Sequence, residues 1–235
     1  CRKVARRVAE EPERENWLVG SEDLPSFLGI PRFEYGLAEE NDEIGVATGA
    51  AVTSAGGDLL SVETTVMAGK SELTLTGQLG DVMQESARAA ISYARSRSAE
   101  LGIPVGFFDS HTIHIHVPAG AIPKDGPSAG VTLATSLISA VTGNKVRKDV
   151  AMTGEVTLRG KVLPIGGTRE KALAAHRGGI TTFIIPKRNE KDLDDLPATV
   201  RDELDIHLVS HMDEVLALAF VAAPRAVKEL AAVGD

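Results

Sequence analysis

One change of hydrophobic period, between residues 111 and 143, constrains the fold of this chain more than any other feature. Ile113, Ile115 and Val117 alternate with polar residues, which is the period-two pattern of a strand with one buried face. A loop rich in proline and glycine follows, and beyond it apolar residues recur at spacings of three and four until Gly143. That spacing predicts a buried helix that stops at the glycine. A strand followed by a buried helix indicates a layered domain of helices on a sheet.

The flanking segments continue this alternation and predict a compact α/β domain from Ile44 onward. Segments rich in Val, Thr and Ile, separated by a turn-forming cluster, predict a β-hairpin from the strands 44–52 and 59–67. Apolar spacing predicts a long amphipathic helix from Val82 to near Gly102. The other expected elements are strands at 73–76, 150–153, 156–163 (around the turn at 159–160) and 181–185, a helix over 169–177, and a charged helix opened by Pro224.

The chain is expected to be a piece of a longer protein, because it opens on Cys1 with no initiator Met. An N-terminal cysteine can also be a nucleophile released by autoprocessing. Here it leads directly into a basic helical segment with Val4 and Val8 on one face, which favours a cut end. We expect residues 1–31 to be the end of a preceding domain, 32–43 to be an acidic linker, and 44–235 to be the main domain.

Charge and composition exclude several classes of protein. Lys plus Arg at 25 against Asp plus Glu at 33 gives 25 − 33 = −8, which argues against a general nucleic-acid binder. No apolar run approaches the roughly 20 residues that span a bilayer. Cys1 is the only cysteine, so a disulfide framework within one chain is excluded, which fits a reducing cytosolic compartment.

Two motifs resemble binding sites without meeting their requirements. Residues 69–71, Gly-Lys-Ser, resemble the end of a phosphate-binding loop, but Thr64 stands where the first glycine is required and a strand follows. His111, His114 and His116 suggest a metal site, yet no nearby cysteine or second histidine cluster completes a ligand set. Partly buried or surface histidines are the favoured interpretation, and we expect no metal and no cofactor in this chain.

The loop PKDGPSAG, residues 123–130, is the strongest chemical signal. Pro127 suits the first position of a helix, where its missing N–H donor would be unpaired anyway. Ser128 then lies in the first turn, near unpaired amides and the positive end of the helix dipole, which can stabilise an oxyanion. A serine that merely caps the helix remains the alternative.

A serine hydroxyl needs a base, and Lys171 is the candidate. It precedes a small apolar helical segment, and if Thr168 is the N-cap, the helix dipole disfavours the charged lysine. Dipole and burial together would lower the pKa of Lys171 from about 10.4 towards roughly 7 to 8. The alternative is an ordinary surface lysine.

Longer motifs give the chain a family resemblance. The segments that carry it are HIHVP (114–118), PKDGPSAG (123–130), AMTGEVTLRG (151–160), LPIGG (163–167), EK (170–171), LTGQLG (75–80), MQES (83–86) and AHRGGI (175–180). In this order and spacing they resemble the proteolytic domain of Lon protease, in its soluble bacterial form, from residue 44 to about 219. The resemblance implies mixed, twisted sheets packed with helices, similar to the ribosomal protein S5 domain 2-like fold.

The resemblance also implies roles for individual residues. Ser128 matches the nucleophile and Lys171 the general base of a Ser-Lys dyad. Thr153 matches the threonine that helps to hold the lysine, and Asp125 matches the acidic residue of the serine loop. Two positions depart from the family pattern: residue 119 is alanine where glutamate is common, and residue 168 is threonine where an aliphatic residue is common.

For the parent protein, the resemblance implies an ATPase module before this domain, with residues 1–31 as its last helices, and assembly into a hexameric ring. ATP and Mg²⁺ would bind that module, not this chain. The implied substrates are unfolded, damaged and short-lived regulatory proteins in the cytoplasm. Two other functions remain open: a catalytically silent Lon-like scaffold, which the presence of both Ser128 and Lys171 opposes, and an RNA-binding module. The net charge and the 4% aromatic content oppose the second.

Overall fold

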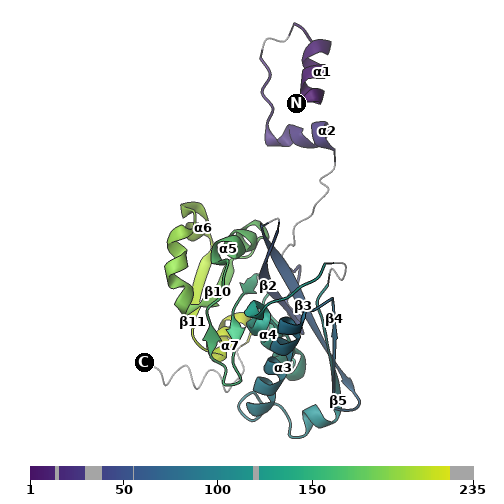
Figure 1. The fold of residues 1–235 in the computed structure, drawn as a ribbon, viewed down its shortest axis with the longest axis vertical. Coiled ribbons are helices and arrows are strands. Elements are labelled where there is room, and N and C mark those ends of the chain that lie inside the picture. The colour runs from purple at the N-terminus through teal and green to yellow at the C-terminus, as the bar shows by residue number, and fades with distance from the viewer. Residues whose placement is uncertain (14–15, 30–38, 55, 119–121, 223–235) are drawn as a thin grey trace. The chain divides into compact units, whose positions relative to one another are not determined.

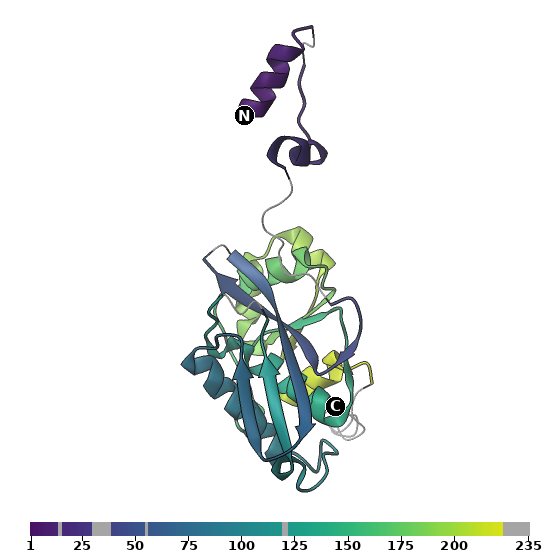
Figure 2. The same cartoon turned by 90° about the vertical axis from the view of Figure 1, so that its right-hand side faces the viewer.

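The structure is a computed structural model that describes residues 1–13, 16–29, 39–54, 56–118 and 122–222 (Figures 1 and 2). Contacts divide the chain into two compact units, Cys1–Tyr35 and Gly36–Asp235. The described elements of the N-terminal unit are α1 (Arg2–Glu10), the 3-10 helix η1 (Ser21–Asp23) and α2 (Leu24–Leu28). Most of the linker expected at 32–43 and the helix expected after Pro224 lie outside the described residues.

The larger unit is built on a mixed sheet. Its strands, among the described residues, follow the spatial order β11-β10-β7-β2-β3-β5-β4. In chain order they are β2 (Val46–Thr53), β3 (Gly56–Ala68), β4 (Glu72–Thr76), β5 (His111–His116), β7 (Val150–Met152), β10 (Thr182–Pro186) and β11 (Asp205–Val209). β2 and β3 pair antiparallel as the predicted hairpin, whereas β7 pairs parallel with both β2 and β10. The predicted α/β class is therefore confirmed.

Two short ribbons accompany this sheet. β1 (Glu43–Ile44) pairs with β6 (Lys145–Val146), and β8 (Glu155–Val156) pairs with β9 (Val162–Leu163), both antiparallel. The second ribbon turns at Gly160, which has φ +79° in the left-handed region that favours glycine. The strand pattern expected over 156–163 is thus a hairpin with short arms.

Helices cover both faces of the central strands. Along β7, Val150 and Met152 join one apolar cluster while Ala151 joins the other, so successive side chains face opposite layers. In the larger unit, the first layer contains α3 (Asp81–Ser96), α4 (Gly130–Thr142) and α7 (Met212–Ala219), and the second contains α5 (Thr168–Arg177), α6 (Ala198–Glu203) and the 3-10 helix η4 (Lys187–Asp195). The 3-10 helices η2 (Phe107–Asp109) and η3 (Pro127–Ala129) lie in connections.

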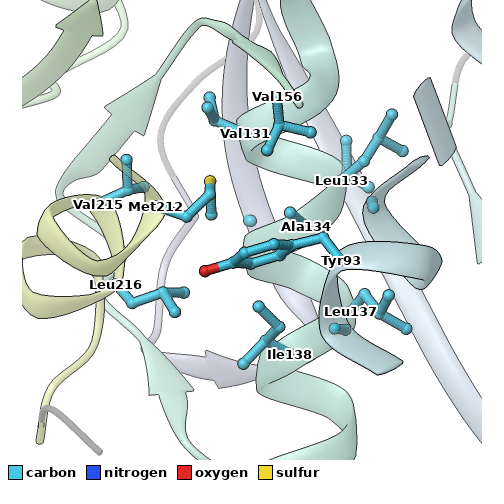
Figure 3. Packing of buried hydrophobic residues seen from close by; sticks show 14 of the residues in the cluster. Tyr93, Val131, Leu133, Ala134, Leu137, Ile138, Val156, Met212, Val215 and Leu216 are labelled. Atoms are coloured by element: carbon cyan, nitrogen blue, oxygen red, sulfur yellow. The ribbon is translucent and has the colours of Figure 1, made fainter. Parts of the chain in front are cut away.

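The first layer centres on α4, the helix that the sequence predicts to be buried. Leu133, Leu137 and Ile138 are completely buried. Figure 3 shows the ring of Tyr93 among these α4 side chains and Met212 and Leu216 of α7. α4 is therefore held between α3, α7 and the sheet, and the burial of residues 130–139 fixes its N-terminus.

Helix α3 is shorter than the sequence predicts. The pattern extends it to near Gly102, but it ends at Ser96. Two serines at this end donate to carbonyl groups of the preceding turn: Ser96 to Tyr93 O at 2.9 Å, and Ser98 to Arg95 O at 2.8 Å. Such local bonds compete with continued helix, which explains the early end.

Candidate active site

Ser128 lies in the 3-10 turn that leads directly into α4. Pro127 is the first residue of that turn, as predicted, and α4 itself begins at Gly130. A Cβ atom on Gly130 would lie 2.8 Å from the backbone N of Val156 and 3.3 Å from the carbonyl oxygen of Gly154. Only glycine permits this approach, so the serine turn lies against the backbone that follows β7.

Backbone hydrogen bonds join the serine turn to the end of β7. The carbonyl oxygen of Ser128 accepts hydrogen bonds from Gly154 N at 2.8 Å and from the Thr153 hydroxyl at 3.2 Å. In return, Val131 N donates to Gly154 O at 3.0 Å. Ser128 and Thr153 are distant in sequence but occupy fixed positions relative to each other.

The side chain of Lys171 extends from α5 to Thr153. The residue is 3% exposed, and its Nζ donates to Oγ1 of Thr153 at 3.2 Å. Because the Thr153 hydroxyl gives its hydrogen to Ser128 O, the hydroxyl oxygen is left to accept from the amine. The structure thus brings Ser128, Thr153 and Lys171 together in one connected group.

Burial is what changes the pKa of Lys171. Desolvation lowers the pKa of Lys171 from 10.5 to about 8, because removal from water disfavours the charged amine. The sequence-based expectation also took Thr168 as the N-cap of this helix, and that position is wrong. Gly167, with φ +70°, is the N-cap, and Thr168 is the first residue of α5.

The position of the glycine explains this difference. Gly167 adopts a left-handed conformation and its carbonyl accepts from Lys171 N at 3.1 Å, so the helix begins at Thr168, one residue earlier than expected. Thr168 is 3% exposed, and its hydroxyl donates to Asp192 at 2.7 Å instead of capping the helix.

Ser128 and Lys171 line a common cavity of about 450 Å³, together with Asp125, Ile165 and Gly167. A second, mainly apolar cavity of about 320 Å³ adjoins Ser128 and is lined by β2, β3 and the serine loop. Within the described residues, no hydrogen bond joins the side chains of Ser128 and Lys171. Catalytic contacts of this kind often tighten only when substrate binds.

Asp125 anchors the serine loop to another helix. One carboxylate oxygen accepts from Met83 N, in the first turn of α3, at 3.0 Å and from Gly126 N at 2.8 Å. An anion at this position also interacts favourably with the helix dipole. The structure therefore places Asp125 at the rim of the cavity with its carboxylate held by amides. Ala119, the other position that departs from the family pattern, lies outside the described residues.

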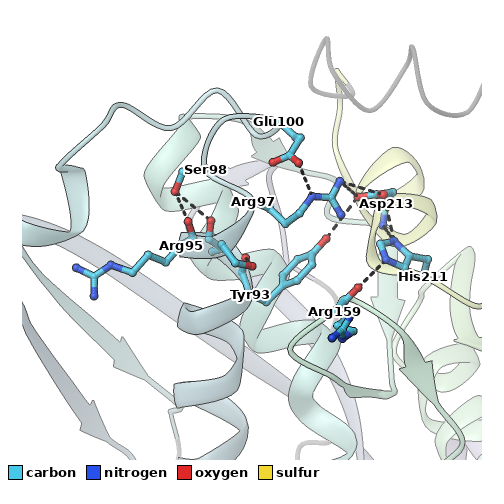
Figure 4. A network of polar contacts seen from close by, with 10 residues as sticks. Tyr93, Arg95, Arg97, Ser98, Glu100, Arg159, His211 and Asp213 are labelled. Atoms are coloured by element: carbon cyan, nitrogen blue, oxygen red, sulfur yellow. Dashed lines mark hydrogen bonds and ion pairs between the residues drawn. The ribbon is translucent and has the colours of Figure 1, made fainter.

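The segment between Thr153 and Lys171 is anchored at its far end by a polar network (Figure 4). His211 contacts Arg159 O through Nε2 at 2.9 Å, and its Nδ1 lies 3.1 Å from Asp213. The Asp213 carboxylate also accepts hydrogen bonds from the Arg97 guanidinium at 3.4 Å and from the Tyr93 hydroxyl at 3.4 Å. Burial beside Asp213 raises the pKa of Tyr93 well above its usual range. The β8–β9 hairpin is thereby fastened to α3 and α7.

In the described part of the chain, the two motifs set aside in the sequence line neither of these cavities. Residues 69–71 connect β3 to β4, and a strand follows them, as predicted. The Thr76 hydroxyl contacts His114 Nε2 at 2.8 Å and His116 Nδ1 at 2.7 Å. Among the residues that the structure describes, no three His, Cys, Asp or Glu side chains are placed to share a metal ion.

The sequence gives no indication of one polar residue beside the site. Asn189 of η4 is 2% exposed and bonds to the segment between β9 and α5. It stands among charged surface residues in the sequence, so its burial becomes visible only when η4 folds against α5. Ala51 and Val52 of β2 also line both cavities, and their strand pattern did not mark them.

Comparison with known proteins identifies relatives of the chain. Residues 18–222 match the family model described as the Lon protease (S16) C-terminal proteolytic domain. The chain is 59% identical over 229 residues to Lon protease of Chloroflexus aggregans, a match that covers 95% of this chain and 28% of the relative. It is 57% identical over 221 residues to Lon protease 1 of Bacillus subtilis, covering 94% and 28%.

A third relative, Lon protease of Brevibacillus choshinensis, is 57% identical over 224 residues, covering 95% of this chain and 29% of the relative. The chain therefore spans less than a third of the length of these curated relatives. In the described part of the chain, every helix is too short or too polar to cross a membrane.

Proposed function

Because the chain belongs to the Lon protease family, as its C-terminal proteolytic domain, we propose that it is a serine endopeptidase with a Ser-Lys dyad. Ser128 is the nucleophile and Lys171 the general base. The observation that carries this assignment is the buried hydrogen bond from Lys171 to Thr153, whose hydroxyl in turn donates to the Ser128 carbonyl. An amine in this setting is neutral at a pH where an ordinary lysine is charged.

In the proposed reaction, neutral Lys171 accepts the Ser128 hydroxyl proton as the serine oxygen attacks the substrate carbonyl carbon. The tetrahedral intermediate collapses when the lysine gives that proton to the leaving amine, and an acyl-serine ester remains. Water then attacks the ester, with Lys171 again accepting and returning a proton. The positive end of the α4 dipole lies beside Ser128 and favours the negative charge that develops in both steps.

Thr153 and Asp125 support this chemistry without exchanging protons. Thr153 accepts one N–H of the amine, which fixes the direction of the nitrogen lone pair. Asp125 holds the serine loop against the N-terminus of α3. The apolar cavity next to Ser128 offers room for an apolar substrate side chain, whereas the cavity of Lys171 accommodates the other side of the scissile bond.

The partners are proposed from family membership. We propose that the substrates are unfolded, damaged and short-lived regulatory proteins, delivered by an ATPase module of the same parent chain in a hexameric ring in the cytoplasm. ATP and Mg²⁺ act in that module. We also propose that residues 1–31 are the end of its helical subdomain, 32–43 the linker and 44–235 the proteolytic domain; the division of contacts after Tyr35 supports this arrangement.

The experiment is active-site labelling combined with peptide cleavage. A fluorophosphonate probe should label the intact protein that carries this chain, and Ser128→Ala should abolish both labelling and cleavage while leaving the thermal unfolding unchanged. Ser86→Ala, in an exposed turn of α3, is the control and should behave as wild type. Cleavage that persists in Ser128→Ala would refute the dyad, and an unlabelled, inactive wild type would favour the scaffold function.

A further inference from the structure

Asn189 makes an unusual pair of contacts with the segment that precedes the lysine helix. Its Oδ1 accepts from Ile165 N at 3.0 Å, and its Nδ2 donates to Ile165 O at 2.8 Å. The side chain thereby satisfies both backbone groups of one residue, as a neighbouring strand would. The reciprocal pattern also fixes which end of the amide is oxygen.

The same amide reaches the first residue of α5. Its Nδ2 lies 2.7 Å from Asp192 Oδ2 and 3.1 Å from the Thr168 hydroxyl, and that hydroxyl donates to Asp192 Oδ2 at 2.7 Å. We name the Ile165 backbone and the side chains of Thr168, Asn189 and Asp192 the Asn189 cluster. Hydrogen bonds from Asn189 and Thr168 hold the pKa of Asp192 below its usual range, so the carboxylate remains an acceptor.

The Asn189 cluster borders the site on two sides. Ile165, Gly166 and Gly167 form a wall of the cavity that contains Ser128 and Lys171. Thr168 begins α5, and the backbone N of Lys171 bonds to Gly167 O. Two adjacent glycines have little conformational preference of their own, so bonds from outside must fix this wall and the start of the helix.

We propose that Asn189 is a positioning residue for Lys171: it fixes the cavity wall through Ile165 and the start of the lysine helix through Thr168. The proposal rests on the Ser-Lys dyad proposed above. Asn189 does not touch the reacting atoms, and its effect passes through the backbone of 165–168. Thr168, which departs from the family pattern, adds a hydroxyl contact to the cluster that an aliphatic residue cannot make.

Loss of the cluster has a consequence that differs from simple loss of stability. When the wall loosens, water reaches the buried amine, and its pKa moves back towards that of an exposed lysine. Among the described residues, Asp125 is the other charged residue that lines this cavity, and its carboxylate is held by the amides of Met83 and Gly126, so it stays in place. A variant that lacks the cluster should therefore reach its full cleavage rate only at a higher pH than the wild type.

The test is the pH dependence of kcat and KM for a short peptide, measured on the intact protein that carries this chain. Asn189→Ala should lower kcat at neutral pH about tenfold or more, change KM less than about threefold, and move the midpoint of the pH–rate curve up by about half a unit or more. Asn144→Ala is the matched control, because Asn144 bonds to Thr142 at the far end of α4. It should keep the wild-type curve.

Two further variants cover the case in which Asn189→Ala does not fold. Thr168→Val removes one hydroxyl at nearly constant volume and should move the midpoint in the same direction by a smaller amount. In Asn189→Asp a carboxylate oxygen would replace the donor and face two acceptors, Ile165 O and the Asp192 carboxylate, so cleavage should be impaired. Adding Asp192→Asn places an amide donor opposite the new carboxylate and should recover part of the activity.

Wild-type kcat and an unmoved midpoint in folded Asn189→Ala would overturn the proposal, as would an unmoved midpoint in Thr168→Val together with no recovery in the double variant. Ser128→Ala and Lys171→Met, measured in parallel, separate this result from failure of the dyad. If those two variants still cleave, the proposed function fails; if they are inactive while Asn189→Ala is normal, the positioning role alone fails.

Discussion

Lys171 Nζ and Thr153 Oγ1 lie 3.2 Å apart in the interior of the domain, and this contact joins the first helix after β9 to the end of β7. The direction of hydrogen bonding is set by the backbone, because the Thr153 hydroxyl donates to Ser128 O. The amine must therefore donate to threonine with one of its hydrogens. The rest of the amine group, with its lone pair in the neutral form, faces the cavity that Lys171 shares with Ser128.

The pH dependence of cleavage should identify the base. With the pKa of Lys171 at about 8, kcat/KM should rise as the pH increases through that value and then level off, whereas a histidine base would titrate near 6.5. Lys171→Arg should be as inactive as Lys171→Ala, because guanidinium keeps its proton at any accessible pH. Rates of a fluorogenic peptide between about pH 6 and pH 10 provide the measurement. Substantial activity in the arginine variant would assign the proton to another group.

Thr153→Val should slow cleavage without unfolding the domain. The exchange keeps the volume but removes the oxygen that accepts from Lys171, at a cost of roughly 1 to 3 kcal/mol in the transition state, or about ten- to a hundredfold in rate. Thr153→Ser retains the hydroxyl and is the matched control. Single-turnover rates of both variants, compared with their melting temperatures, test whether the hydroxyl orients Lys171. Equal rates for Thr153→Val and wild type would show that Thr153 has only a structural role.

Lys171→Met should stabilise the fold at neutral pH. Folding lowers the pKa of this amine from 10.5 to about 8, so below about pH 8 the charged form is buried at a cost that methionine avoids. We expect a gain of about 1 to 3 kcal/mol near pH 7, which shrinks as the pH rises from about 8 to 10.5 because the wild-type lysine becomes neutral in the folded state first.

Urea unfolding at several pH values measures this difference. Exposed Lys187→Met serves as the comparison and should change the free energy of unfolding by less than about 0.5 kcal/mol. A destabilised Lys171→Met at pH 7 would show that the buried amine contributes favourable contacts larger than its desolvation cost.

Gly57→Ala should damage both stability and activity. A Cβ atom there would lie 1.9 Å from the carbonyl oxygen of Glu170 and 3.1 Å from Cβ of Ala174, so β3 or α5 must move. Displacement of α5 carries Lys171 with it, and overpacking of this kind costs typically about 1 to 3 kcal/mol. Gly166→Ala meets no atom within 4 Å and is the control for thermal stability. An unchanged melting temperature in Gly57→Ala would contradict this packing.

Local sequence patterns predicted the helices and strands that carry the site more accurately than they predicted the contacts between those elements. The buried faces of the β5 strand and of α4 followed from spacing alone, because one-sided burial imposes a period on the sequence. The position of Pro127 likewise followed from the chemistry of a helix start. The resemblance supplied Thr153 and Lys171 as a pair, which spacing could not have done.

What the sequence did not predict depends on tertiary contacts. The N-cap at Gly167 was missed because threonine is a common cap, and only the left-handed backbone of the glycine moves the start of α5 by one residue. Asn189 was missed because a polar residue between charged neighbours resembles a surface position until its amide pairs with Ile165. The length of α3 was overestimated because serine bonds at its end override the apolar pattern.

The strand order of the main sheet also bears on how the site is assembled during folding. β2 pairs with its sequence neighbour β3, but its other partner is β7, where Gly49 lies opposite Met152. Contacts between residues so distant along the chain carry a large loop-closure entropy and form slowly. Thr153 directly follows β7, so a chain in which only the β2–β3 hairpin has formed has not yet placed Thr153 beside Lys171. The lysine of the proposed dyad is therefore oriented only once β7 has joined the sheet, and cleavage is expected to be a property of the closed sheet alone.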